Sequence, residues 1–282
     1  MKFSQMKYRR PDTTAVEMEY RDITQRFPLC ENAEQQLALL DRHEKLLGNV
    51  RTMSNLAYIR NSINTTDPFY KEEQAFFDEY LPSLQEFVQA FMDQVLASEF
   101  RPELEKVTGP LFFRNQEIAK KTFSPEIIPL MQEENRLATE YEQLLASADL
   151  SIQGESCNLS EIIRYQTSPD RKLRQEAWEK TDAFFAENGQ RLDELYDGLV
   201  RCRTEQAHRL GYENFVQLGY DRLGRNCYSP EDVAEFRKQV ADDLVPMVHR
   251  LKEKQAERQK AILFPREVKK SWWKPQAGCI GK

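Results

Sequence analysis

The sequence has 282 residues, of which 40% are hydrophobic and 30% charged, and its formal net charge is −6. A chain of this length can bury one large core or two smaller ones. The negative charge disfavours nucleic acid and anionic membranes as partners, and no run approaches the ~20 apolar residues that a membrane-spanning helix needs.

The first half of the chain predicts long amphipathic helices. A short helix is expected over residues 11–27, and a longer one from Glu31 to about Asn64, because apolar residues recur there at helical spacing. Asp67 and Pro68 supply an N-cap and a first-turn proline for the next helix, which Pro82 should kink. Its apolar stripe consists of Phe76, Tyr80, Leu84, Phe87, Phe91 and Val95.

The two long helices should pack antiparallel, and the aromatic stripe fits either core packing or a groove for a peptide or cofactor. Arg101-Pro102 should end the second of them. Shorter helices are expected over 108–122 and from Ser124 to about Leu145. Helical periodicity lapses at residues 150–158, where the sequence predicts a short hairpin or a single strand.

The second half of the chain begins with the helix-start sequence Ser168-Pro169-Asp170, with Ser168 as the expected N-cap. A second helix should carry an apolar face, and Gly211 after Leu210 predicts a left-handed cap. Ser229-Pro230 begins a final long helix, which Pro246 should bend. The face of the second helix consists of Leu192, Leu195, Leu199 and Cys202, and the buried stripe expected of the final helix of Val233, Phe236, Val240, Leu244, Val248 and Leu251.

These patterns predict an all-α protein whose long amphipathic helices form two packed lobes, with at most a small extended element near residues 150–160. The expected divisions are an N-terminal helical lobe over 1–149, a second helical bundle over 150–263 and a basic tail over 264–282. By themselves, the patterns give an architecture without an evident chemistry.

Many positions between Asp170 and Arg225, and others as far as Pro246, match one family in order and spacing. They are Arg171, Arg174, Ala177, Tyr196, Leu199, Arg203, Ala207, Leu210, Gly211, Tyr212, Tyr220, Phe236, Val240, Val245 and Pro246. Through them the chain resembles the oligoendopeptidase F branch of the M3 zinc metallopeptidases, over roughly residues 6–261. The resemblance implies two helical lobes around a channel in which short peptides are cut, and a zinc site on an HExxH helix beyond the part that resembles this chain.

The three histidines lack the spacing of a peptidase zinc site. Such a site needs two histidines one helical turn apart with a glutamate between them. His43 is followed by Glu44, but Leu47 stands where the second histidine belongs, and neither His208 nor His249 has a partner at that spacing. The sequence therefore predicts no catalytic residue and no metal ligand in this chain, and leaves the substrate-binding residues unknown.

The segment over 264–282 departs from the family pattern. It carries Trp272-Trp273 among several lysines. Its net charge is therefore positive, opposite to that of the preceding sequence. Three interpretations stay open: a tail that binds nucleic acid or membrane, a tail that docks on a partner, or unselected sequence at the end of a truncated gene.

The function expected from the resemblance is the non-catalytic N-terminal portion of an M3-type oligoendopeptidase, which forms a channel wall for oligopeptides and is inactive alone. Alternatives are a stand-alone helical module that binds peptides or proteins, or a chain whose catalytic half comes from a separate polypeptide. Self-association through exposed apolar surface is also expected. The five scattered cysteines form no CxxC pair, and no apolar run follows the basic N-terminal residues, which predicts a cytoplasmic protein with reduced thiols.

Overall fold

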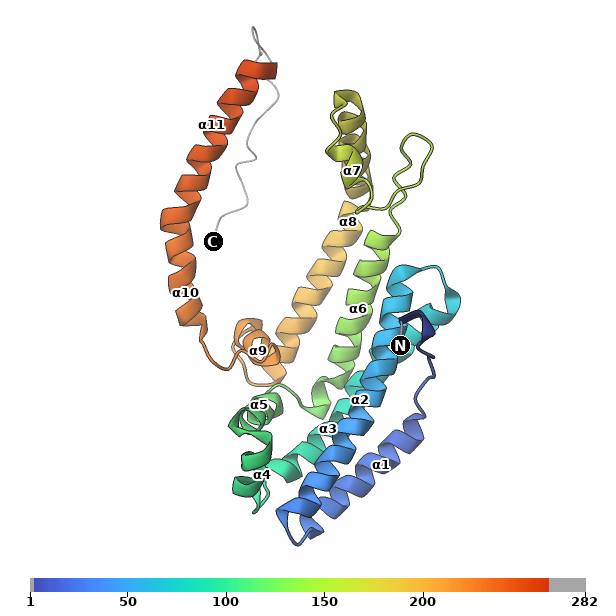
Figure 1. The fold of residues 1–282 in the computed structure, drawn as a ribbon, viewed down its shortest axis with the longest axis vertical. Helices are drawn as coiled ribbons and strands as arrows, with labels where there is room; N and C mark the ends of the chain where they lie inside the picture. The colour runs from blue at the N-terminus through green and yellow to red at the C-terminus, as the bar shows by residue number, and fades with distance from the viewer. Residues whose placement is uncertain (1–2, 264–282) are drawn as a thin grey trace. The chain divides into compact units, whose positions relative to one another are not determined.

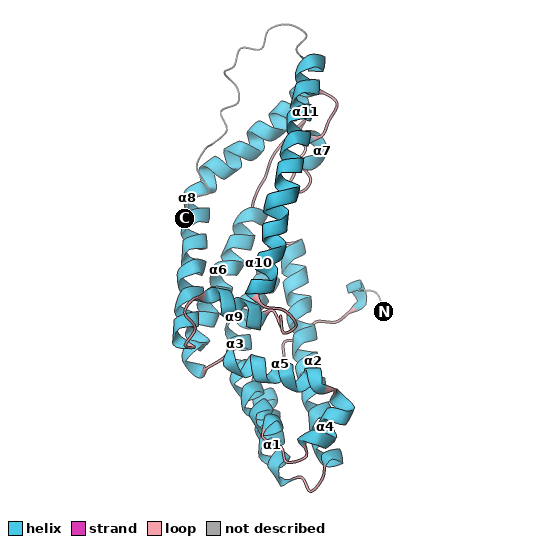
Figure 2. Ribbon diagram, turned by 90° about the vertical axis from the view of Figure 1, so that its left-hand side faces the viewer, coloured by secondary structure: helices cyan, strands magenta, loops and turns pink. Residues whose placement is uncertain are grey.

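A computed structural model describes residues 3–263, and in that range the chain consists of helices joined by short connections (Figures 1 and 2). The predicted all-α class is confirmed. By their contacts, the residues up to Asn226 form one unit and those from Cys227 onward form another. The basic tail predicted over 264–282 lies outside the described residues.

The first unit begins with three helices that share the largest core. They are α1 (Thr13–Arg26), α2 (Ala33–Ile63) and α3 (Pro68–Leu96). The cap residues explain where they begin, because the side chains of Asp12, Asn32 and Asp67 each accept a hydrogen bond from a first-turn N–H. α2 and α3 pack antiparallel, as predicted, since a short turn joins them.

Most of the aromatic stripe on α3 belongs to this core. Its members Tyr80, Leu84, Phe91 and Val95 are buried, while Phe76 and Phe87 are partly buried against the same cluster. Of the two interpretations of this stripe, core packing is therefore the one that the structure supports. The helix continues through Pro82, and the kink predicted there stays a prediction.

Two short helices follow where the sequence predicted one. α4 (Arg101–Thr108) begins at the predicted break, because Pro102 sits in the first turn, where its missing N–H costs nothing. Gly109 has a φ of 81°, in the left-handed region, and separates α4 from α5 (Pro110–Lys121). The helix predicted over 108–122 is thus α5, within two residues at each end, whereas α4 was not predicted.

α6 (Ile128–Ala146) and α8 (Arg171–Arg209) form the second long pair of the first unit (Figure 1). The prediction of two helices from Ser168 onward was wrong, because α8 runs unbroken through Asn188-Gly189 while it packs along α6. Its N-cap is Asp170 and not Ser168, since the Asp170 carboxylate accepts the Lys172 N–H at 2.8 Å.

The segment between these two helices forms the hairpin that was one of the two predictions. The N–H of Ile152 donates to the Glu155 carbonyl at 2.8 Å, and Glu155 donates back at 2.9 Å. Gln153 and Gly154 both have positive φ, which a type I′ turn requires. Short helix α7 (Ile163–Gln166) follows, and its neighbours Ile152, Cys157 and Ile162 form a small core with Ala177 of α8.

The predicted boundary near residue 150 lies inside the first unit. The largest core draws its buried residues from positions 16–113, and two smaller clusters draw theirs from positions 137–202. The division into lobes at residue 150 stays a prediction. The first unit closes with α9 (Phe215–Arg222), after Gly211 has reversed the chain with a φ of 82°.

The second unit contains α10 (Pro230–Gln239), a π-helical turn (Val240–Leu244) and α11 (Val245–Leu263). Ser229 and Asp232 form a complete capping box at its start. The wide turn immediately precedes Pro246, whose ring cannot fit against a regular α-helical turn. The stripe predicted to be buried is not: Phe236, Leu244, Val248 and Leu251 are exposed, because these elements have no second helix of their own unit against them in the described range.

Candidate functional site

A groove between α3 and α6, with a volume of about 690 Å³, is a candidate binding site. Its α3 wall includes Lys71, Ala75 and Asp78, and its α6 wall includes Arg136 and Thr139. Acidic, basic, amide and apolar side chains all contribute to the lining. Such a mixed lining can hydrogen-bond to a polar chain such as a peptide.

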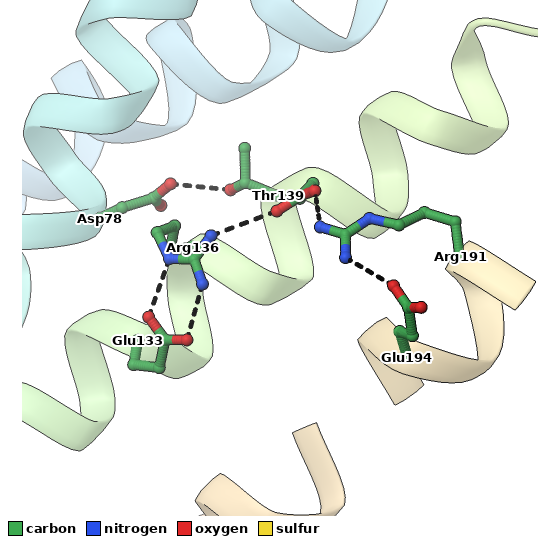
Figure 3. Close-up of polar contacts among 7 residues, drawn as sticks. Asp78, Glu133, Arg136, Thr139, Arg191 and Glu194 are labelled. Atoms are coloured by element: carbon green, nitrogen blue, oxygen red, sulfur yellow. Dashed lines mark hydrogen bonds and ion pairs between the residues drawn. The ribbon is translucent and has the colours of Figure 1, made fainter. Parts of the chain in front are cut away.

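Asp78 lines this groove, and two hydrogen bonds hold its side chain in place. Its carboxylate accepts hydrogen bonds from the Thr139 hydroxyl at 2.7 Å and from the Gln74 amide at 2.8 Å. Burial raises the pKa of Asp78, and these two donors oppose that rise. The Asp78–Thr139 bond joins α3 to α6, as Figure 3 shows.

Side chains of α6 also donate hydrogen bonds to main-chain carbonyls of α3. Pro82 has no N–H to donate to the Asp78 carbonyl, and the Asn135 side chain donates to that oxygen instead, at 2.9 Å. One turn away, the Gln132 amide donates to the Glu79 carbonyl at 2.9 Å. The proline in α3 thus creates an acceptor that α6 uses for docking.

A chain of ion pairs continues from the groove to α8 (Figure 3). Arg136 bonds Glu133 through two nitrogens at 2.6 and 2.8 Å, which lowers the pKa of Glu133. Arg136 also reaches Glu140, and Arg191 of α8 bridges Glu140 and Glu194. Because these groups are well exposed, each pair adds little stability. Of the four pairs, Arg191–Glu140 is the one that joins α8 to α6.

A second junction lies where α6, α8 and α9 meet, around Glu134. Its carboxylate accepts hydrogen bonds from Arg203 at 2.6 Å and from Gln206 at 2.9 Å, and it pairs with Arg222 at 3.3 Å. Burial lowers the pKa of Arg222, an effect that Glu134 opposes. All polar groups at the centre of this junction are therefore matched, as expected of a structural contact.

The residues that carried the family resemblance have mainly structural positions. Arg203 pairs with Glu134, Ala207 is fully buried, and Gly211 occupies the left-handed turn. The Tyr212 hydroxyl donates to Asp221 at 2.8 Å. Tyr196 differs from these, because 65% of it is exposed on α8.

The three histidines lie in unrelated surroundings. His43 is buried in the core beside Tyr20, with Leu47 buried one turn further on. His208 contacts the Glu213 carbonyl at 3.1 Å, and His249 of α11 faces Glu253 at 3.2 Å. Within residues 3–263 no three His, Cys, Asp or Glu side chains are grouped so that they could hold a metal ion. These donors do not fit a catalytic zinc site.

Sequence reasoning missed the groove at Asp78. A signal for it was present, because a proline inside a helix always frees the carbonyl four residues earlier, and Pro82 identifies that residue as Asp78. The partner on α6 had no comparable signal, since Asn135 is one of many polar residues on that helix.

Two family models match this chain. The Peptidase M3 N-terminal domain matches residues 3–123, and Peptidase family M3 matches residues 164–272. No curated protein sequence matches. No helix in the described range combines the length and apolar character that a membrane crossing demands.

Solved structures match nearly the whole chain. PZ peptidase A, solved with an inhibitor, is 41% identical with a TM-score of 0.88, over 91% of this chain and 46% of its own. A protein assigned as oligoendopeptidase F from Bacillus anthracis strain Ames is 37% identical with a TM-score of 0.89, over 96% of this chain and 49% of its own. A further protein assigned as oligoendopeptidase F is 41% identical over 92% of this chain and 46% of its own, with a TM-score of 0.88. The chain therefore spans about half the length of these relatives.

Proposed function

Because this chain belongs to the M3 peptidase family, in which it corresponds to the N-terminal part of an oligoendopeptidase, we propose that it forms a wall of the channel that admits oligopeptides. The observation that carries the proposal is the similarity of the fold over more than nine-tenths of the chain, at 37–41% identity. The mixed polar lining of the groove between α3 and α6 supports contact with a peptide main chain.

We also propose that the 282-residue chain does not cleave peptides by itself. Peptide hydrolysis in this family is expected to need zinc on an HExxH helix, and the donors within residues 3–263 do not form such a set. We therefore assign to this chain the residues that hold and orient the peptide. We assign it no role in proton transfer or nucleophile activation. We also propose a cytoplasmic location, which the free thiols of Cys30, Cys157 and Cys202 support.

A peptidase assay tests the proposal of inactivity. The purified chain is incubated with a quenched fluorescent oligopeptide, with and without added zinc, and its metal content is measured. An M3 oligoendopeptidase that contains both halves is the positive control. We expect no turnover and no stoichiometric zinc. Chelator-sensitive hydrolysis by a homogeneous preparation would overturn this part of the proposal.

Peptide binding tests the role of the groove separately. Calorimetry with an uncleaved oligopeptide should detect binding by the parent chain, and Lys71→Glu should weaken it, because Lys71 lines the groove. Lys172→Glu on α8 is the matched control, since it makes the same charge change outside the groove. Equal binding by the two variants would remove the groove from the proposal.

A second candidate function is a stand-alone module that binds a protein partner. The specific observation in its favour is the exposed aromatic face of α8, on which Trp178, Phe185 and Tyr196 recur at helical spacing. Trp178→Ala together with Tyr196→Ala should then abolish partner binding and leave oligopeptide binding unchanged. If the double variant instead loses oligopeptide binding, this face belongs to the peptide channel.

A further inference from the structure

A small pocket beside the groove is lined by residues of α2, α3 and α6. Its volume is about 220 Å³, below the ~300–1,000 Å³ typical of pockets that hold a whole drug-sized ligand. Thr139 and Gln143 of α6 line both the pocket and the groove, so the two spaces adjoin. The pocket therefore fits one chemical group of a larger ligand that lies in the groove.

Two hydroxyl groups in the lining are left as hydrogen-bond acceptors for a ligand. The Ser62 hydroxyl donates to the Tyr58 carbonyl at 2.8 Å, and the Thr139 hydroxyl donates to the Asp78 carboxylate at 2.7 Å. A hydroxyl has a single proton, so each oxygen has only lone pairs to offer to a further partner. A ligand that donates hydrogen bonds suits both positions.

Asn61 adds an acceptor that lacks a donor. This residue lines the pocket and is 6% exposed, and its side-chain oxygen has no hydrogen-bond partner among the described residues. Buried polar side-chain atoms are nearly always hydrogen-bonded, so such an exception indicates a missing partner. Because rotation about the last side-chain bond of asparagine is soft, the amide can present this oxygen to a donor in the pocket.

Glu142 gives the pocket a negative charge. Among the described residues that line the pocket it alone is charged, and none of the residues three or four positions from it along α6 is basic. The ring of Tyr58, a residue that is 44% exposed, belongs to the same lining, and aromatic faces attract cations. A primary ammonium matches these features, because it is a cation with three N–H donors and no acceptor.

We propose that this pocket binds a primary ammonium group, which the amino terminus of an oligopeptide in the adjoining groove supplies. A lysine side chain has the same chemistry and is the other source of such a group. The identity of the larger ligand rests on the proposed function, whereas the ammonium site rests on the pocket alone. The amino-terminal residue of the peptide then lies between α2 and α6, and the rest of its main chain lies between α3 and α6.

Calorimetry of the full chain with three forms of one uncleaved oligopeptide tests the inference. The first form has a free amino terminus, the second is N-acetylated, and the third is N-acetylated and contains one lysine. The free form should bind about tenfold more tightly than the acetylated form, because acetylation removes a charged hydrogen-bond donor. Recovery of tight binding by the third form would assign the pocket to a lysine side chain.

The variant Glu142→Gln should bind the free form as weakly as the parent chain binds the acetylated form. Glu187→Gln is the matched control, because it makes the same charge change at an exposed position of α8 outside the pocket, and it should behave as the parent chain does. Equal affinities of the parent chain for all three forms would overturn the inference. So would an equal loss of affinity in the two variants.

If no form of the peptide binds, the proposed function fails, and n-butylammonium then tests the pocket by itself. Nuclear magnetic resonance of the Asn61 side-chain amide follows this titration. A saturable shift in the parent chain that Glu142→Gln abolishes would sustain the ammonium site. No shift in the parent chain, or the same shift in both proteins, would overturn it.

Discussion

Asn135 of α6 donates its side-chain amide to the main-chain carbonyl of Asp78 in α3, with 2.9 Å between nitrogen and oxygen. That carbonyl is the one that Pro82 leaves without a helical donor. A defect in one helix thus becomes a specific docking point for another, and Asp78 is also one of the residues that line the proposed peptide groove.

This relationship predicts a thermodynamic coupling between Asn135 and Pro82. Asn135→Ala should lower the free energy of unfolding by about 1–2 kcal/mol, because it leaves a carbonyl unsatisfied. In a Pro82→Ala background the new N–H satisfies that carbonyl, so the same change should cost less than half as much. Denaturant unfolding of the four proteins measures the coupling.

Thr139→Val is the matched control for this cycle. It removes a hydrogen bond to the Asp78 carboxylate and not to the Asp78 carbonyl, so its cost should be the same in both backgrounds. Equal costs of Asn135→Ala in both backgrounds would contradict the coupling.

The sequence predicted helices well where short-range chemistry decides, and less well where packing decides. Asp67-Pro68 and Ser229-Pro230 begin helices as expected, because a cap and a first-turn proline act within a few residues. The unbroken α8 was not predicted, because packing against α6, and not local helix propensity, stabilises the middle of this helix. The exposure of Phe236 also escaped prediction, because an apolar stripe does not state what covers it.

In the candidate site, too, local motifs could be predicted from the sequence and long-range contacts could not. The missing partner for His43 was visible in the spacing, because an HExxH pair is a local motif. The groove at Asp78 depends on contacts between residues more than fifty positions apart, such as Asn135 with Asp78, and a single sequence gives no information on such pairs.

His43 predicts an acid-dependent loss of stability. Burial, with a smaller effect of Arg51, lowers the pKa of His43 to about 4, against an ordinary value near 6.5. Between those values the unfolded chain binds a proton that the folded chain does not, so the free energy of unfolding should fall as pH drops from about 6.5 to about 4. The full loss is roughly 3 kcal/mol.

His43→Gln isolates this contribution, because it removes the titrating ring while it keeps a polar group near the Tyr20 hydroxyl. Urea unfolding at several pH values should give a shallower pH dependence for the variant. If the two proteins lose stability in parallel between pH 6.5 and 4, the His43 imidazole is not the titrating group.

Two glycines should respond in opposite directions to alanine. Gly211 has a φ of 82°, which alanine adopts only with strain, so Gly211→Ala should lower the free energy of unfolding by about 1–2 kcal/mol. Gly48 lies exposed within α2 with nothing within 4 Å of an added Cβ, so Gly48→Ala should raise it by roughly 0.5–1 kcal/mol. Thermal unfolding measures both, and a shift of the same sign in the two variants would contradict the argument.

Arg10 offers an internal comparison between a buried and an exposed carboxylate. It pairs with Glu73, whose side chain is 4% exposed, and with Glu72, whose side chain is 73% exposed. Burial opposes the charge on Glu73, but hydrogen bonds from Arg10 and Tyr8 outweigh it and lower the pKa of Glu73. Glu73→Gln should therefore cost about 3 kcal/mol, because it leaves Arg10 without its buried counter-charge, and Glu72→Gln less than about 1 kcal/mol. Denaturant unfolding compares them, and equal losses would mean that this pair does not hold the N-terminal segment to α3.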